Sequence, residues 1–165
     1  MLNKVGSFRL IDRVRAEFGE LPPPKEPIGL YRPAVITGNE VIVSGHGPWL
    51  NGKPVTGKVG ATIDVERGAE IARLVGMGIL STLEHEVGLH RIKRVLYLHG
   101  MVNAVDDFTA HPRVIDGCAR LFEQLWGPQC GVGARSAVGH NSLPENIAVE
   151  IWGRFELKDE EDGRA

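Results

Sequence analysis

An arginine and a glutamate near the C-terminal end of the chain are the residues with the clearest potential for chemistry. Arg135 lies at the start of one strand-like segment, and Glu150 lies inside the apolar run 147–152. A guanidinium holds a carboxylate through two parallel, charge-assisted hydrogen bonds, and a carboxylate side chain can position water or move a proton. Together the two side chains could hold and hydrolyse a small acid.

Two adjacent strands would have to position this pair. The stretch 139–146 is rich in Gly, Asn, Ser and Pro, so we expect a hairpin with a long loop. Alternation over 147–155 places Glu150 and Trp152 on one face. A structural alternative also fits: Arg135 and Glu150 could form a partly exposed cross-strand ion pair, contributing about 0.2–1 kcal/mol and no chemistry.

The rest of the chain predicts an α+β domain with helices on one face of a mixed sheet. A helix over 8–18, with Ser7 as N-cap and Gly19 as stop, leads into a proline-rich connector, so 1–27 forms an N-terminal extension. After it the patterns predict a hairpin, a helix, a strand, a helix and two strands. The hairpin is expected at 31–37 and 41–44, the first helix at 65–87 with Asp64 or Thr62 as cap, and the next strand at 92–105. The second helix is expected to start at Asp107 or Thr109, and the last two strands lie around Arg135 and at 147–155.

Several short motifs together resemble the Rid family, also called YjgF. The order Ala-Arg-Ser at 134–136, Leu-Pro at 143–144 and an apolar strand carrying Glu150 is similar to the C-terminal signature of that family. The segments 28–31, 41–48 and 102–108 resemble its upstream motifs. The resemblance covers 28–157 and identifies the chain as a divergent member with an N-terminal helical extension and a charged tail, 158–165, expected to be disordered.

The resemblance implies a chorismate-mutase-like fold and a homotrimer with ligand pockets between subunits. It implies that a 2-imino or 2-enamino acid is hydrolysed to a 2-keto acid and ammonia, without metal or organic cofactor. Arg135 would grip the substrate carboxylate and Glu150 would align the attacking water. The remaining substrate contacts implied are the Tyr31 side chain and backbone groups around Ser44, Gly45 and Ala137.

Other positions leave alternatives open. His46, His140 and Trp152 lie near the expected pocket in sequence, where they could tune polarity or transfer protons, or could serve packing alone. Ala137 stands where the family often has cysteine and Pro112 where asparagine is common. A non-catalytic protein that binds small carboxylates therefore remains a second hypothesis.

Composition narrows the function classes. The 165 residues carry a formal net charge of −2 with dispersed basic residues, which does not favour nucleic acid as a partner or the endoribonuclease activity attributed to some members of the family. Cys118 and Cys130 do not have zinc-site spacing, and no metal site is expected. No run of 18 apolar residues is present, so we expect a cytoplasmic protein without a membrane span.

Overall fold

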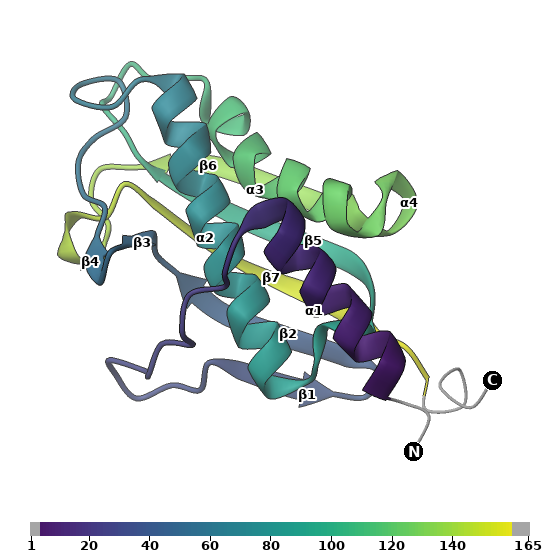
Figure 1. Cartoon of the computed structure of the whole chain (residues 1–165). Helices are drawn as coiled ribbons and strands as arrows, with labels where there is room; N and C mark the ends of the chain where they lie inside the picture. The colour runs from purple at the N-terminus through teal and green to yellow at the C-terminus, as the bar shows by residue number, and fades with distance from the viewer. Residues whose placement is uncertain (1–3, 160–165) are drawn as a thin grey trace.

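A five-stranded mixed sheet forms the centre of the computed structural model, which describes residues 4–159 (Figure 1). The strands lie in the order β1-β2-β7-β5-β6; β5 and β6 are parallel and the other neighbours are antiparallel. A separate two-stranded hairpin, β3 and β4, lies beside this sheet. The strands are β1 (Ala34–Thr37), β2 (Glu40–His46), β3 (Trp49–Leu50), β4 (Lys53–Pro54), β5 (Ile92–Asn103), β6 (Ala134–His140) and β7 (Val149–Leu157).

The predicted hairpin between the last two strands is wrong, because β5 lies between β6 and β7. The connection between them hydrogen-bonds to a distant segment instead of folding back on itself. Asn146 accepts from the backbone N–H of Gly57, and Ala148 donates to the carbonyl of Val55. These contacts carry the chain past β5 before β7 begins.

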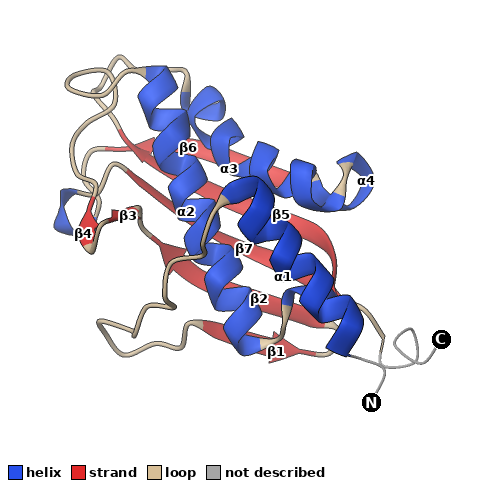
Figure 2. Ribbon diagram, viewed as in Figure 1, coloured by secondary structure: helices blue, strands red, loops and turns tan. Residues whose placement is uncertain are grey.

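The helices α1 to α4 lie on one face of the five-stranded sheet, as Figure 2 shows. The Asp64 carboxylate caps the first turn of α2 by accepting from the N–H of Arg67, as expected from the sequence. The second long helix starts later than predicted, at His111, with Pro112 in its first turn, where the missing N–H costs no hydrogen bond. The helices are α1 (Lys4–Phe18), α2 (Val65–Glu86), α3 (His111–Trp126), α4 (Pro128–Gly131) and the 3-10 turns η1 (Leu89–Arg91) and η2 (Pro144–Asn146).

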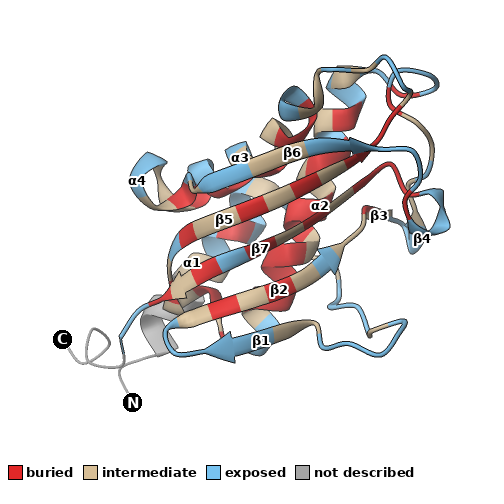
Figure 3. Cartoon of the chain, turned by 180° about the vertical axis from the view of Figure 1, so that it is seen from behind, coloured by how far each residue is buried: buried red, intermediate tan, exposed pale blue. Residues whose placement is uncertain are grey.

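The core fills the space between the sheet and the α2–α3 layer. Along β7, Val149, Ile151 and Phe155 are fully buried under the helices, whereas Glu150 and Trp152 alternate onto the opposite face. This confirms the facing predicted from the sequence. Seen from behind, the sheet shows the same alternation of buried and partly exposed residues, with the edge strands β1 and β6 exposed (Figure 3).

The N-terminal helix packs against the end of α3. Arg13 donates hydrogen bonds to the backbone carbonyls of Gln124 and Leu125, and Val14 is fully buried. The helix begins at Lys4, before the predicted cap Ser7, and ends as predicted before Gly19, which adopts φ 95°.

No helix among residues 4–159 is long and apolar enough to span a membrane. Residues 160–165 of the expected tail lie outside the described residues.

Candidate functional site

A cavity of about 950 Å³ opens beside the end of β2, between α2 and the N-terminal connector. Its volume is at the upper end of the range for small-molecule sites. Six of the residues singled out from the sequence line it together: Tyr31, Ser44, Gly45, His46, Glu150 and Trp152. Three others, Arg135, Ala137 and His140, do not.

The floor of the cavity is a contact between Gly45 and Glu150. Pairing between β2 and β7 shifts register between Val43 and His46, so Ser44 and Gly45 lie in a bulge. A Cβ atom at position 45 would collide with the carboxylate of Glu150. With the carboxylate in this position against the bulged backbone of β2, a side chain at position 45 would force the end of Glu150 to move away.

The surroundings of Glu150 change its acidity. Partial burial raises the pKa of this carboxyl group above its ordinary value, and the nearby charge of His140, on β6, offsets part of the rise. A carboxylate with a raised pKa is a stronger base, better matched to taking a proton from water near neutral pH. His140 therefore acts on the cavity through its charge, although it does not line the cavity.

His46 is held in one tautomer by its two neighbours. Its Nδ1 atom lies 2.6 Å from the carbonyl oxygen of Ser44, which can only accept, so Nδ1 carries the proton. Its Nε2 atom, 2.8 Å from the Thr82 hydroxyl, then accepts from that group. Burial lowers the pKa of His46, which keeps the ring neutral. With both nitrogens engaged, His46 holds the Ser44-Gly45 bulge in place.

Removing the Thr82 hydroxyl tests this account of His46. Thr82 is buried, so Thr82→Val would leave Nε2 without a donor at nearly constant volume. We expect the free energy of unfolding, measured in urea at pH 8, to fall by about 1–3 kcal/mol. Thr82→Ser keeps the hydroxyl and serves as the matched control. An unchanged stability in the valine variant would contradict the hydrogen-bonded role of His46.

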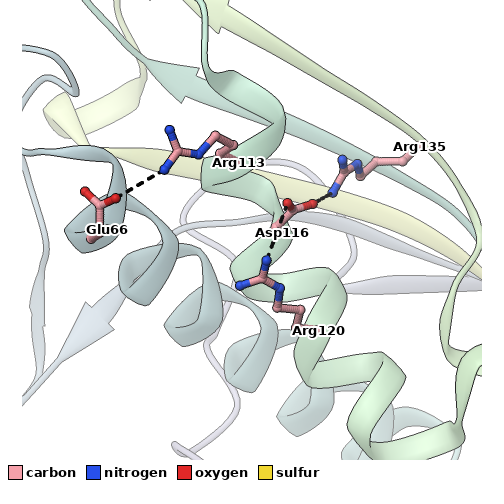
Figure 4. A network of polar contacts seen from close by, with 5 residues as sticks. All are labelled: Glu66, Arg113, Asp116, Arg120 and Arg135. Atoms are coloured by element: carbon pink, nitrogen blue, oxygen red, sulfur yellow. Dashed lines mark hydrogen bonds and ion pairs between the residues drawn. The ribbon is translucent and has the colours of Figure 1, made fainter.

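Arg135 lies at the far side of the sheet from the bulge. It projects from the edge strand β6 toward α3, where its Nη1 atom lies 2.7 Å from a carboxylate oxygen of Asp116 (Figure 4). Asp116 also lies 4.0 Å from Arg120 of its own helix. The alternative in which Arg135 pairs with Glu150 across adjacent strands is therefore wrong, because β5 separates β6 from β7 and places those strands about 10 Å apart.

The ion pair leaves part of the guanidinium of Arg135 available. Among residues 4–159, Asp116 is the group that hydrogen-bonds to Arg135, through Nη1 alone. The Arg135 side chain remains 26% exposed, so its other N–H groups can reach a ligand from the open edge of β6. Asp116 thus holds the arginine in place while leaving donors for a second carboxylate.

The neighbouring position 137 contributes no polar side chain. Ala137 is half-buried and packs against the core from β6. Burial raises the pKa of the nearby Cys118 thiol to about 12, so this cysteine does not supply a reactive thiolate near Arg135.

Among the described residues, no group of three or more His, Cys, Asp or Glu side chains is placed to hold a metal ion.

The sequence interpretation did not include one wall of the cavity, the connector between α1 and β1. Lys25 and Glu26 line the cavity, and the Lys25 ammonium lies 3.1 Å from the ring centroid of Trp49. The proline run was interpreted as a tether, since periodicity carries no information about where a stretch without helix or strand packs. A lysine inside a proline-rich segment followed by the Tyr31 motif was the available signal.

Comparison with known proteins supplies a family. Residues 12–152 match the family described as YjgF/chorismate mutase-like, putative endoribonuclease. Protein TCP17 of Trypanosoma cruzi is 34% identical over 158 residues, which is 94% of this chain and 99% of that protein.

Two crystal structures are similar over nearly the whole chain. A protein of unknown function from Agrobacterium tumefaciens is 34% identical with a TM-score of 0.85, covering 94% of this chain and 96% of its own. A putative endoribonuclease from Shewanella oneidensis is 29% identical with the same TM-score, covering 90% and 99%. RidA from an Antarctic Psychrobacter, 22% identical over 81% of this chain and 93% of its own, has a TM-score of 0.56 and shares the fold.

The matches to Protein TCP17 and to the Agrobacterium tumefaciens structure extend into the N-terminal segment. A match over 94% of the chain leaves about 10 of the 165 residues unmatched, fewer than the 27 residues of the N-terminal extension, so part of that extension is matched in both relatives.

Proposed function

The chain belongs to the YjgF/chorismate mutase-like, putative endoribonuclease family, and from this premise we propose that it is an imine deaminase. The substrate class is a 2-imino acid or its 2-enamino tautomer, and the products are a 2-keto acid and ammonia. The observation that carries the proposal is Glu150, a carboxylate of raised pKa at the floor of a cavity, held against the Gly45 backbone.

The geometry suits hydrolysis of a C=N bond. Glu150 accepts a proton from water as the water oxygen attacks the electrophilic carbon of the protonated imine. Glu150 then gives this proton to nitrogen, the C–N bond breaks, and ammonia leaves as the hydroxyl oxygen forms the C=O bond. Glu150 takes up the hydroxyl proton, which passes to ammonia or to solvent. Backbone groups of the Ser44-Gly45 bulge lie beside the carboxylate, where they can hold the water or the substrate.

A substrate carboxylate requires a positive partner, and we assign this role to Arg135. In one chain Arg135 lies on the opposite edge of the sheet from the bulge of β2. A site containing both residues then requires two copies, with the open β6 edge of one copy beside the cavity of another. We propose a homotrimer with its sites between subunits, in which Tyr31 and Trp152 contribute the aromatic walls.

The first experiment measures ammonia and keto-acid release from 2-imino acids generated in situ. We expect the purified protein to accelerate release, and we expect Arg135→Ala to lower kcat/KM about 10–100-fold, because one charge-assisted contact contributes about 1.5–3 kcal/mol. Arg120→Ala, which alters a neighbouring arginine of the same network, is the control and should retain activity (Figure 4). Full activity in Arg135→Ala would contradict the assignment.

Two other functions are less well supported. Non-catalytic binding of small carboxylates would use the same arginine, and is distinguished by calorimetric binding without turnover. Endoribonuclease activity would require contacts to a phosphate backbone, whereas Lys25 is the one Lys or Arg among the described residues that line the cavity.

Cys118 and Cys130 are free thiols, which supports a cytoplasmic location for the reaction.

A further inference from the structure

The charges around the cavity are unevenly distributed. Acidic side chains line it at four positions, and among the described residues Lys25 is the one Lys or Arg side chain in the lining. If the substrate of the proposed reaction carries an acid group besides the carboxylate held by Arg135, this chain offers one positive side chain to bind it. The acidic lining residues are Glu20, Glu26, Glu145 and Glu150.

Lys25 is positioned but not neutralised. Its ammonium group lies over the ring of Trp49, 3.1 Å from the centroid, and no carboxylate of the described residues lies within ion-pair distance of it. Glu20, a possible competitor in the lining, is instead paired with Arg15. A ring face engages one side of an ammonium group, and the remaining N–H donors of the exposed Lys25 stay available to a ligand.

The connector fixes where this charge lies. The buried hydroxyl of Ser81, on α2, donates a hydrogen bond to the carbonyl of Pro22 at 2.5 Å. Pro22-Pro23-Pro24 then holds the chain extended up to Lys25, because proline restricts φ. Lys25 therefore follows a segment anchored to α2, the helix that lines one side of the cavity through Leu74, Gly78 and Thr82.

Lys25 and Glu150 contact the two ends of one short segment, residues 45–49. Glu150 contacts Gly45, and Lys25 lies on Trp49, four residues further along the chain. Four residues of extended backbone span at most about 14 Å, which sets an upper limit on the distance between the Cα atoms of Gly45 and Trp49. The Lys25 side chain therefore lies on the part of the lining beyond Gly45, where the distal end of a longer substrate would extend. A three-carbon imino acid would leave most of the 950 Å³ cavity unfilled.

We infer that Lys25 binds a second acid group, and that the cavity takes imines of dicarboxylic amino acids in preference to those of short monocarboxylic ones. The inference rests on the proposed function, in which Arg135 holds the carboxylate next to the reacting carbon. Lys25 is a specificity-determining contact at the distal end of the substrate. It takes no part in the attack of water.

A matched pair of substrates tests this assignment. The imines of glutamate and of norvaline have the same number of carbons, and only the first ends in a carboxylate. We expect the wild-type protein to prefer the glutamate imine at least tenfold in kcat/KM. Lys25→Gln should remove that preference by raising KM for the glutamate imine, with the norvaline imine unchanged. Lys25→Arg should retain most of the preference.

Control variants separate the loss of the Lys25 charge from a change in the structure of the cavity wall. Lys53→Gln makes the same change on β4, beside the cavity but outside its lining, and should alter neither substrate. Equal losses for both imines in Lys25→Gln would show that the lysine only holds the wall in place, and no change for either would show that it makes no contact. Both results would overturn the inference.

A binding measurement keeps the inference distinct from the proposed function. Calorimetry compares 2-oxoglutarate with 2-oxopentanoate, the stable keto-acid counterparts of the two imines, on wild type and Lys25→Gln. We expect tighter binding of 2-oxoglutarate, lost in the variant. If neither imine is hydrolysed but this difference is found, the deaminase proposal fails and the distal acid site stands. Equal binding of both keto acids by the wild type would overturn the site itself.

Discussion

Glu150→Gln should reduce imine hydrolysis by about 10²–10⁴-fold in kcat while leaving the fold intact, because the amide cannot accept the proton of the attacking water. The side chains are nearly equal in size, so the contact with Gly45 is retained. Steady-state ammonia release gives kcat, and circular dichroism checks the fold. A variant with wild-type kcat would remove Glu150 from the reaction.

The same carboxylate makes two pH dependences predictable. Activity should fall on the acid side as Glu150 becomes protonated, with the midpoint displaced upward from that of an ordinary carboxyl, because burial raises its pKa. The contribution of Glu150 to the free energy of unfolding should instead grow as the pH falls. A folded-state pKa above the unfolded value stabilises the protein below the unfolded pKa, and this contribution is lost as the pH rises through the folded pKa.

Glu150→Gln therefore has a second expected result, a free energy of unfolding higher than wild type at neutral pH. The difference should shrink as the pH falls toward about 3, below the pKa of about 4.3 of an unfolded glutamate, where the carboxyl is protonated in both states. Urea unfolding at the two pH values measures it. A variant less stable than wild type at neutral pH would contradict the raised pKa.

Gly117→Ala should strongly destabilise the protein, because a Cβ atom at position 117 would collide with the backbone carbonyl of Ala69, where α3 crosses α2. A backbone atom cannot rotate away as a side chain can, so the two helices would have to separate. We expect a loss of at least about 1–3 kcal/mol in the free energy of unfolding, measured in urea. This loss would exceed the gain in helix propensity over glycine.

Gly78→Ala is the matched control for this prediction. It adds the same methyl group to a glycine of α2, but the nearest atom, on the ring of His46, lies at an ordinary contact distance of 3.7 Å. Stability should rise by about 0.5–1 kcal/mol, because alanine is the better helix former. Opposite signs at the two positions would confirm the close α2–α3 crossing, and equal gains would contradict it.

The parts of the fold that depend on local pattern were predictable from the sequence. Strict alternation from Val149 onward gave the facing of β7, and Asp64 marked the start of α2, because both signals act within a few residues. The pairing of β6 was not predictable in this way. The position of β6 depends on hydrogen bonds that join the connection before β7 to Val55 and Gly57. No local sequence pattern encodes these long-range contacts.

The candidate site was predictable in part for the same reason. Motifs identified Glu150 and the Ser44-Gly45 strand end, and these residues do line one cavity. The partner of Arg135 was missed, because Asp116 lies on a helix nineteen positions away in sequence and meets the arginine only in the folded chain. Lys25 was missed because its place in the lining depends on how an irregular connector packs against Trp49.

The central claim is that Glu150 of one copy and Arg135 of another form one hydrolytic site, and mixed oligomers test it most directly. Arg135→Ala and Glu150→Gln chains, each weakly active alone, are co-expressed with different tags and purified through both. In a mixed trimer about one third of the sites would combine an intact arginine with an intact glutamate. The account predicts imine hydrolysis recovered to about one third of wild type. Purified mixed oligomers that stay as inactive as the single variants would contradict it.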